Sequence, residues 1–163
     1  MKLWEEIEAA QKKIKKAIRR TPVIYSDTFS KMTGKEVFLK LENLQETGSF
    51  KVRGAYNRLI HLSLGEKERG VIAASAGNHA QGVAFAAAQL GLEATIIMPR
   101  GASISKQMAT EGYGARVVTC EPTLASREST VAALIQDHGY TLVHPFDDWR
   151  VIAGQSTAAS ELI

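Results

Sequence analysis

The sequence predicts an α/β protein built on a parallel sheet with helices on both faces. Four apolar runs have the length of buried strands, at 71–74, 94–98, 115–118 and 141–143. Helix-compatible stretches separate them and are each followed by a glycine, at 78–90, 103–113 and 124–138. Strand and helix therefore alternate with short links, which is typical of a parallel sheet with right-handed crossovers.

The segment before this alternation predicts a helix, a strand and a second helix. Apolar residues recur at spacings of three and four over residues 3–18, which indicates one buried helical face. Pro22 ends that helix, because proline disfavours the helical conformation of the residue before it. The apolar run 37–41 predicts a strand, and the helix after it is expected over residues 49–61.

The segment at the other end, 151–163, predicts the beginning of a further helix. Asp147 and Asp148 precede it and are candidates for its N-terminal cap. The segment reaches residue 163 without a glycine, proline or polar tail to end it. We therefore expect these residues to be cut from a longer protein.

Composition excludes several classes of protein. With 163 residues, 45% hydrophobic and 23% charged, the chain is typical of a globular domain and not of a disordered one. It lacks the run of about 18 apolar residues that a membrane span needs, and its single cysteine gives no reason to expect secretion. We expect a cytoplasmic protein without a membrane partner.

The net charge of +3 has a local origin. Residues 1–20 carry seven basic and three acidic side chains, whereas the rest of the chain is slightly acidic. Acidic residues begin that segment and basic residues end it, as the dipole of a solvated helix favours. We therefore expect no nucleic-acid partner.

Common phosphate and metal motifs are missing from the sequence. No P-loop pattern is present, and the glycine pair at 112–114 lacks a third glycine and precedes a strand instead of following one. The histidines and the single cysteine do not have metal-ligand spacing, so we expect no metal site.

Two segments remain in which a strand gives way to a helix, the edge at which parallel sheets bind ligands. In the segment 75–82, small residues lead into a helix whose first amides either bind an anion or are capped by Ser75 or Asn78. In the segment 48–55, Lys51 is expected in the first turn of a helix, at the N-terminal end where the dipole disfavours a positive charge. It is either a nucleophilic amine or an exposed surface lysine.

Taken together, these segments strongly resemble a known family. The stretches KLENLQETGSFKVRGAYNRL (40–59) and AASAGNHAQGVA (73–84) are similar to those of threonine dehydratases, which are fold-type-II enzymes that use pyridoxal 5′-phosphate. Three further segments match in the same order, at 20–26, 98–99 and 144–155. Residues 53–55, which follow Lys51, and residues 79–81, which follow Asn78, are typical of the dehydratase and racemase branch of this family.

The resemblance implies a role for each site residue. Lys51 would bind the cofactor aldehyde covalently and serve as the catalytic base, with Phe50 packed beside the cofactor and Asn78 bonded to its ring oxygen. The carboxylate of the amino-acid substrate would be held mainly by backbone amides of Ser75, Ala76, Gly77, Asn78 and His79. The implied reaction is β-elimination, which converts L-threonine to 2-oxobutanoate and ammonia, with serine giving pyruvate as a side activity.

Two alternatives stay open. Serine dehydratase or racemase is one, although Ala76 stands where racemases typically carry a serine as second acid/base. A non-catalytic, truncated module that binds an amino acid is the other.

The glycine-rich phosphate loop of the family comes after residue 163, so the chain alone is expected to hold the cofactor weakly and to be inactive.

The resemblance also implies a domain organisation. Residues 1–52 would be the N-terminal part of the large cofactor domain, 53–148 the small α/β domain, and 149–163 the return into the large domain. The full-length protein is expected to be a homo-oligomer.

Overall fold

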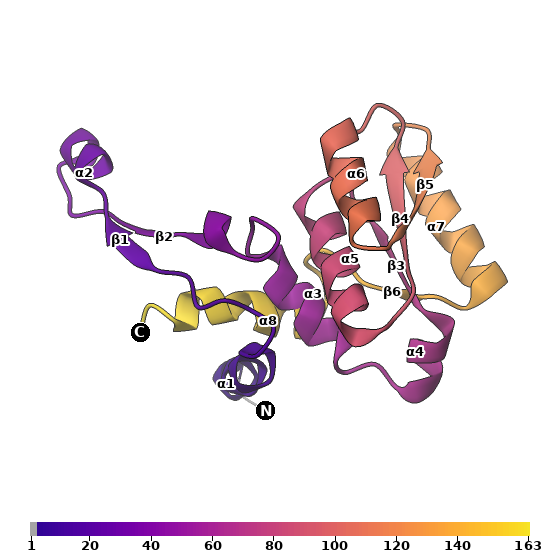
Figure 1. The fold of residues 1–163 in the computed structure, drawn as a ribbon, viewed down its shortest axis with the longest axis horizontal. Helices are drawn as coiled ribbons and strands as arrows, with labels where there is room; N and C mark the ends of the chain where they lie inside the picture. Colours follow the sequence, from indigo (N-terminus) through magenta and orange to yellow (C-terminus); the bar gives the residue numbers. More distant parts are fainter. Residues whose placement is uncertain (1–2) are drawn as a thin grey trace.

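The structure, a computed structural model, describes residues 3–163. An α/β unit lies at one end and a small antiparallel hairpin at the other, with α1, α3 and α8 between them (Figure 1). In chain order the elements are α1 (Leu3–Ile14), β1 (Val23–Tyr25), α2 (Asp27–Thr33), β2 (Phe38–Lys40), the 3-10 helix η1 (Glu42–Leu44), α3 (Lys51–Leu59), α4 (Leu64–Arg69), β3 (Val71–Ala74), α5 (Asn78–Leu90), β4 (Ala94–Pro99), α6 (Ile104–Gly112), β5 (Arg116–Cys120), α7 (Leu124–His138), β6 (Thr141–Leu142) and α8 (Trp149–Ser160).

The α/β unit contains a four-stranded parallel sheet in the order β5-β4-β3-β6. β3 pairs with β4 on one side and with β6 on the other, and β5 continues the sheet beyond β4. The chain therefore adds β4 and β5 on one side of β3 and then crosses back to add β6 on the other.

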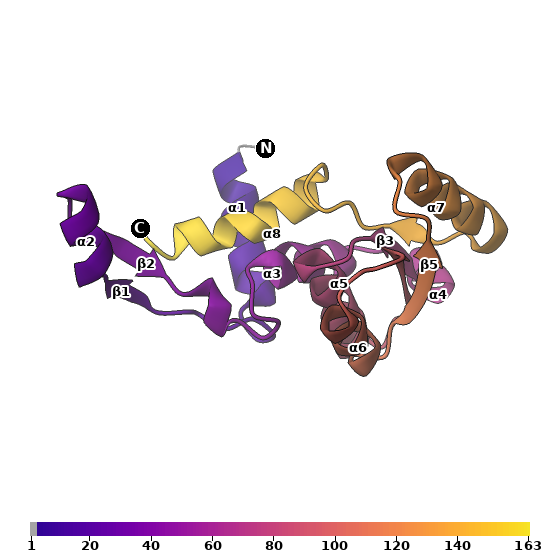
Figure 2. The same ribbon diagram turned by 90° about the horizontal axis from the view of Figure 1, so that it is seen from above.

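Helices cover both faces of this sheet. Val71 and Ala73 of β3 and Ile96 of β4 pack in one core with α3 and α5, whereas Ile72 and Ile97 pack in another core with α7. Neighbouring residues of a strand point to opposite faces, so one apolar run supplies both cores. Figure 2 shows α5 and α6 on one side of the sheet and α7 on the other. The predicted fold class is confirmed.

The N-terminal part differs from the expected arrangement. α1 ends at Ile14, whose carbonyl accepts hydrogen bonds from the amides of Ala17 and Ile18, so the predicted helix over residues 3–18 is too long. β2 lies within the predicted strand, but it pairs antiparallel with β1, which was not predicted. β1 is three residues long and exposed throughout, so its sequence carries no burial pattern that would reveal it.

α2 and α4 were also not predicted, although both have local signals. Ser26 caps α2 by accepting a hydrogen bond from an amide of its first turn, and Gly34 ends it in the left-handed region at φ 66°. Ser63 and Glu66 form a capping box at the start of α4. At the start of α8, Asp148 accepts bonds from the amides of the first turn, so one of the two predicted caps is confirmed.

Glycines bring α3 and α8 into backbone contact. A Cβ atom at Gly154 would lie 2.5 Å from the carbonyl oxygen of Arg53 and 2.8 Å from the Cα atom of Gly54. A Cβ atom at Gly54 would in turn lie 2.8 Å from the carbonyl oxygen of Val151. The two helices can therefore cross at this distance only without side chains at the crossing point.

We expect Gly154→Ala to lower the free energy of unfolding by about 1–3 kcal/mol, because the added methyl group must push the two backbones apart. Urea denaturation measures this change. Gly112→Ala is the matched control, since a Cβ atom there meets nothing within 4 Å and alanine favours a helix by up to about 1 kcal/mol. Equal unfolding midpoints for the two variants would contradict the close crossing.

Candidate active site

The site lies where the strand order of the sheet reverses. β3 and β6 are neighbours, but the chain continues from β3 towards β4 on one side and returns to β6 on the other. The turn 75–77 follows β3, and the segment 143–148 follows β6. Open α/β sheets bind ligands at the carboxyl ends of the strands at such a switch point.

Lys51 begins α3 and is half-buried. Its Nζ atom donates a hydrogen bond of 3.0 Å to the carbonyl oxygen of Pro145 and lies 5.3 Å from the centre of the Phe50 ring. Within residues 3–163 its ammonium group forms no ion pair with a carboxylate. Lys51 is therefore tethered to the segment after β6, which differs from a freely solvated surface lysine.

The turn between β3 and α5 presents open backbone amides. Gly77 is the N-cap of α5 and has no side chain to cap it, and the Ser75 hydroxyl accepts a bond from the amide of Gly77 instead. Across residues 3–163, the amides of Asn78, His79 and Ala80 have no hydrogen-bond acceptor. The first turn of α5 therefore keeps the donors that bind anions at helix N-termini.

The fold brings the two predicted segments together. A Cβ atom at Gly82 of α5 would lie 3.0 Å from the amide nitrogen of Val52 and 3.1 Å from the carbonyl carbon of Lys51. Both ribbon views show α3 and α5 side by side (Figures 1 and 2). The backbone of Lys51 thus lies against the second turn of the helix whose first turn presents the open amides.

His79 ties the first turn of α5 to the segment after β6. Its Nε2 atom donates a hydrogen bond of 2.9 Å to the carbonyl oxygen of Val143, and its Nδ1 atom is buried without a partner among the described residues. Burial lowers the pKa of His79 to about 4, and the nearby charge of Lys51 acts in the same direction. His79 is therefore neutral at physiological pH.

The pKa of His79 predicts a pH dependence of stability. The unfolded imidazole gains a proton near pH 6.5, whereas the folded one stays neutral down to about pH 4, so unfolding takes up a proton in that interval. The free energy of unfolding should fall as the pH falls from 6.5 to 4, by up to about 1.4 kcal/mol per pH unit. Denaturant unfolding over this range measures the slope.

His79→Gln is the control for this prediction, because glutamine does not titrate. Glu42 and Glu66 also have lowered pKa values, and their contribution to acid destabilisation is common to both proteins. The difference between the two slopes therefore isolates His79. Identical slopes would contradict a neutral buried imidazole.

An apolar cavity of about 590 Å³ adjoins the site. Ala74, which precedes the turn into α5, and Pro145, which accepts the bond from Lys51, both contribute to its wall. Val131 and Ile135 of α7 form the opposite side. The cavity therefore lies at the carboxyl ends of β3 and β6, beside the residues that the sequence singled out.

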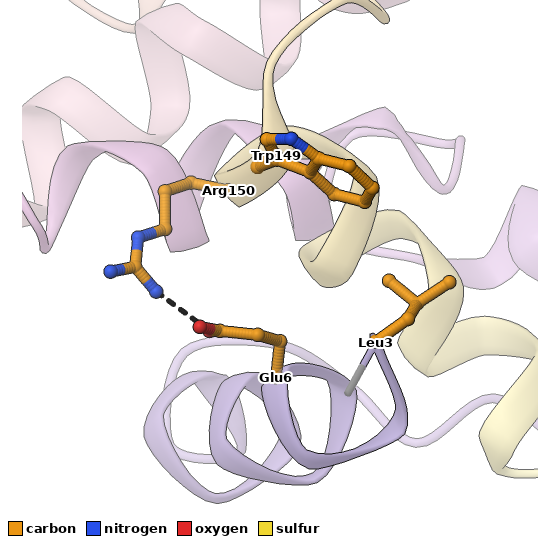
Figure 3. Close-up of a pocket in the computed structure, with 4 residues that line it drawn as sticks. All are labelled: Leu3, Glu6, Trp149 and Arg150. Carbon is orange, nitrogen blue, oxygen red and sulfur yellow. Dashed lines mark hydrogen bonds and ion pairs between the residues drawn. The ribbon is translucent and has the colours of Figure 1, made fainter. Parts of the chain in front are cut away.

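A second cavity, of about 340 Å³, lies between α1 and the start of α8 (Figure 3). Glu6 and Arg150 close one side of it with an ion pair of 2.7 Å, and Leu3 and the exposed Trp149 line the other. None of these four is a predicted site residue. The ion pair joins α1 and α8, two helices that are distant in sequence.

Sequence reasoning missed two groups at this site, one beside Lys51 and one beside Gly77. A backbone carbonyl such as that of Pro145 leaves no signal in a side-chain pattern. Lys106, interpreted from the sequence as a solvated side chain, is exposed, but its Nζ atom lies 3.7 Å from where a Cβ atom of Gly77 would be. The turn before α5 therefore has a cation beside it.

Residues 3–163 contain no cluster of three or more side chains suited to holding a metal ion. No helix in the same range has the length and apolar character needed to cross a bilayer.

Comparison with known proteins agrees with the sequence resemblance. Residues 14–163 match the family described as pyridoxal-phosphate dependent enzyme. L-threonine ammonia-lyase from Thermotoga maritima is 51% identical over 160 residues, which cover 98% of this chain and 40% of that protein. The chain therefore spans less than half the length of this curated relative.

Solved structures show the same similarity. Serine racemase from Dictyostelium discoideum has a TM-score of 0.90 and 44% identity, over 97% of this chain and 52% of that one. The processed form of threonine deaminase isoform 2 from Solanum lycopersicum has a TM-score of 0.89 and 36% identity, over 98% of this chain and 46% of that one. The resemblance to the N-terminal portion of threonine dehydratases is thus confirmed, and the chain belongs to the family of pyridoxal-phosphate dependent enzymes.

Proposed function

We propose that the protein is a threonine ammonia-lyase that converts L-threonine to 2-oxobutanoate and ammonia, with serine giving pyruvate as a side reaction. One observation carries this proposal. The amine of Lys51 and the open amides of α5 lie at the same switch point of the sheet. An amine that moves a proton and a site that binds a carboxylate are two of the parts that elimination from an amino acid requires.

The surroundings of Lys51 fit pyridoxal phosphate. The hydroxyl oxygens of Thr47 and Ser49 are buried without a hydrogen-bond partner among the described residues, although buried polar atoms almost always have one. A bound group with polar atoms would satisfy them. We propose that Lys51, Phe50 and Asn78 hold the cofactor, which supplies an electron sink that no side chain provides.

The substrate carboxylate is proposed to bind at Ser75–His79. The open amides and the dipole of α5 both favour an anion there, and the ammonium group of Lys106 adds a positive charge beside Gly77. His79 stays neutral and anchors this turn to Val143. Binding at this point would place the α-carbon near Lys51.

With the cofactor as electron sink, the proposed reaction would need proton transfers and the exchange of water, and no oxidant. The amine of Lys51 would take the α-proton, and the β-hydroxyl group would leave as water when one proton is returned to it. A second water molecule would then replace the amino group, which departs as ammonia. Threonine thus gives 2-oxobutanoate and ammonia without an oxidant. The methyl group of Ala76 has no proton to deliver to the other face of the α-carbon, which supports elimination over racemisation.

Product analysis tests the proposal. The 163-residue chain is incubated with pyridoxal phosphate, the C-terminal portion of a family member and either L-threonine or L-serine. The amounts of 2-oxobutanoate, pyruvate and D-serine are then measured. We expect mainly 2-oxobutanoate from threonine, and little from the chain alone. D-serine as the main product would favour a racemase, and amino-acid binding that survives Lys51→Ala without cofactor would favour a non-catalytic module.

A further inference from the structure

The carbonyl group that holds Lys51 has a second donor. Gln155 of α8 donates a hydrogen bond of 3.2 Å from its Nε2 atom to the oxygen of Pro145, which also accepts the 3.0 Å bond from Lys51. A carbonyl oxygen has two lone pairs and can accept both bonds. Because the two nitrogen atoms contact the same oxygen, Gln155 and Lys51 lie close to each other.

Gln155 reaches this oxygen because α3 has no side chain in its way. The Cγ atom of Gln155 lies only 2.6 Å from where a Cβ atom of Gly54 would be. Gly54 is three residues after Lys51 in α3, so the two lie on the same side of the helix. The side chain of Gln155 thus rests on the face of α3 from which Lys51 extends.

We propose that Gln155 is a positioning residue, which fixes the Pro145 carbonyl as the acceptor of the Lys51 amine whenever that amine is not covalently engaged. The inference rests on the proposed function only for the role of Lys51. Without the amide of Gln155, the carbonyl loses one of the two donors that orient it, and the amine is held less firmly.

Competitive labelling of lysines tests this role in the absence of cofactor and substrate. The protein is treated with a trace of formaldehyde and cyanoborohydride, and the methylation rate of Lys51 is divided by that of Lys35, an exposed lysine near the hairpin. Gln155→Met keeps the length of the side chain and removes its donor. We expect the rate ratio to rise about two- to tenfold, the effect of one net hydrogen bond.

Gln155→Glu separates positioning from a merely structural role. Its carboxylate donates no bond to Pro145 but attracts the nearby ammonium group of Lys51 directly, so the rate ratio should fall below that of the wild type. A structural defect would change the ratio in the same direction in both variants. Gln136→Met and Gln136→Glu, on the exposed side of α7, are the matched controls and should leave the ratio unchanged.

Opposite changes in the two variants would support the proposal. An unchanged ratio, or a change in the same direction, would overturn it. Circular dichroism checks the fold, and Gln155→Leu replaces the methionine variant if that one is unfolded. Failure of the proposed function would show instead as absent 2-oxobutanoate with the labelling pattern intact.

Discussion

Lys51→Ala is expected to lower the turnover of threonine by about 10³-fold or more, because it removes both the attachment point proposed for the cofactor and the base. Borohydride reduction in the presence of pyridoxal phosphate should add a pyridoxyl group to Lys51 in the wild type and none at that position in the variant. Intact mass and peptide mapping measure this. Activity is assayed with the C-terminal portion supplied.

The loss should not arise from unfolding. Lys51 contributes one hydrogen bond, to the carbonyl oxygen of Pro145, so its removal should change the free energy of unfolding by only about 1 kcal/mol. Lys35→Ala is the control, since this exposed lysine lies outside the site. Unchanged turnover in the Lys51 variant, with the pyridoxyl group on another lysine, would show that the site has been assigned to the wrong residue.

Of the variants proposed here, Arg53→Met is expected to lower the free energy of unfolding the most, by about 3–5 kcal/mol. The guanidinium group of Arg53 is almost fully buried and pairs with two carboxylates, those of Glu42 at 2.8 Å and Glu161 at 2.7 Å. It also donates hydrogen bonds to the Thr157 hydroxyl and the Arg19 carbonyl. Methionine fills the space but leaves the largely buried carboxylate of Glu42 without an ion-pair partner, whereas Glu161 keeps its ion pair with Lys40.

Denaturant unfolding of three variants tests this account. Arg100→Ala removes an exposed ion pair with Glu121 and should cost at most about 1 kcal/mol. Adding Glu42→Gln to Arg53→Met should restore part of the loss, because one uncompensated charge disappears with it. A loss in Arg53→Met no larger than that in Arg100→Ala would contradict the importance of the buried pair.

The pKa of Glu42 gives a second measurement on the same residues. Burial raises this pKa, but hydrogen bonds from Arg53 and Thr21 outweigh burial and hold it below its usual value. The stabilisation is therefore present above the unfolded pKa and is lost as the pH falls through the lower folded pKa. In Arg53→Met, the pKa of Glu42 should rise, because the hydrogen bond and the charge that lower it are removed. NMR titration of the Glu42 carboxyl carbon measures this change.

Prediction from the sequence succeeded where burial leaves a continuous pattern. The strands β3 and β4 are covered on both faces, so each appears as an apolar run. The turn after β3 lies at the carboxyl end of a parallel strand, as predicted. Lys51 follows the antiparallel hairpin instead, so it reaches this turn through the packing of α3 against α5. β1 and its antiparallel pairing with β2 escaped prediction because all three residues of β1 are exposed and leave no burial pattern in the sequence.

The network around Arg53 and the contact of Gln155 could not be predicted in the same way. Glu161 lies 108 residues from Arg53 in sequence, and neither residue's local pattern indicates the other. The acceptor of both Lys51 and Gln155 is a main-chain carbonyl, which any residue provides. Only the packing of α8 against α3 selects these partners.

The crossing of α3 and α8 has a consequence for the order of folding. About a hundred residues, including the whole parallel sheet, separate Gly54 from Gly154, and bringing such distant points together costs chain entropy. Assembly of the sheet shortens that loop, so we expect the two glycines to meet late in folding. A contact formed after the rate-limiting barrier governs how fast the native state opens and has little influence on how fast it forms.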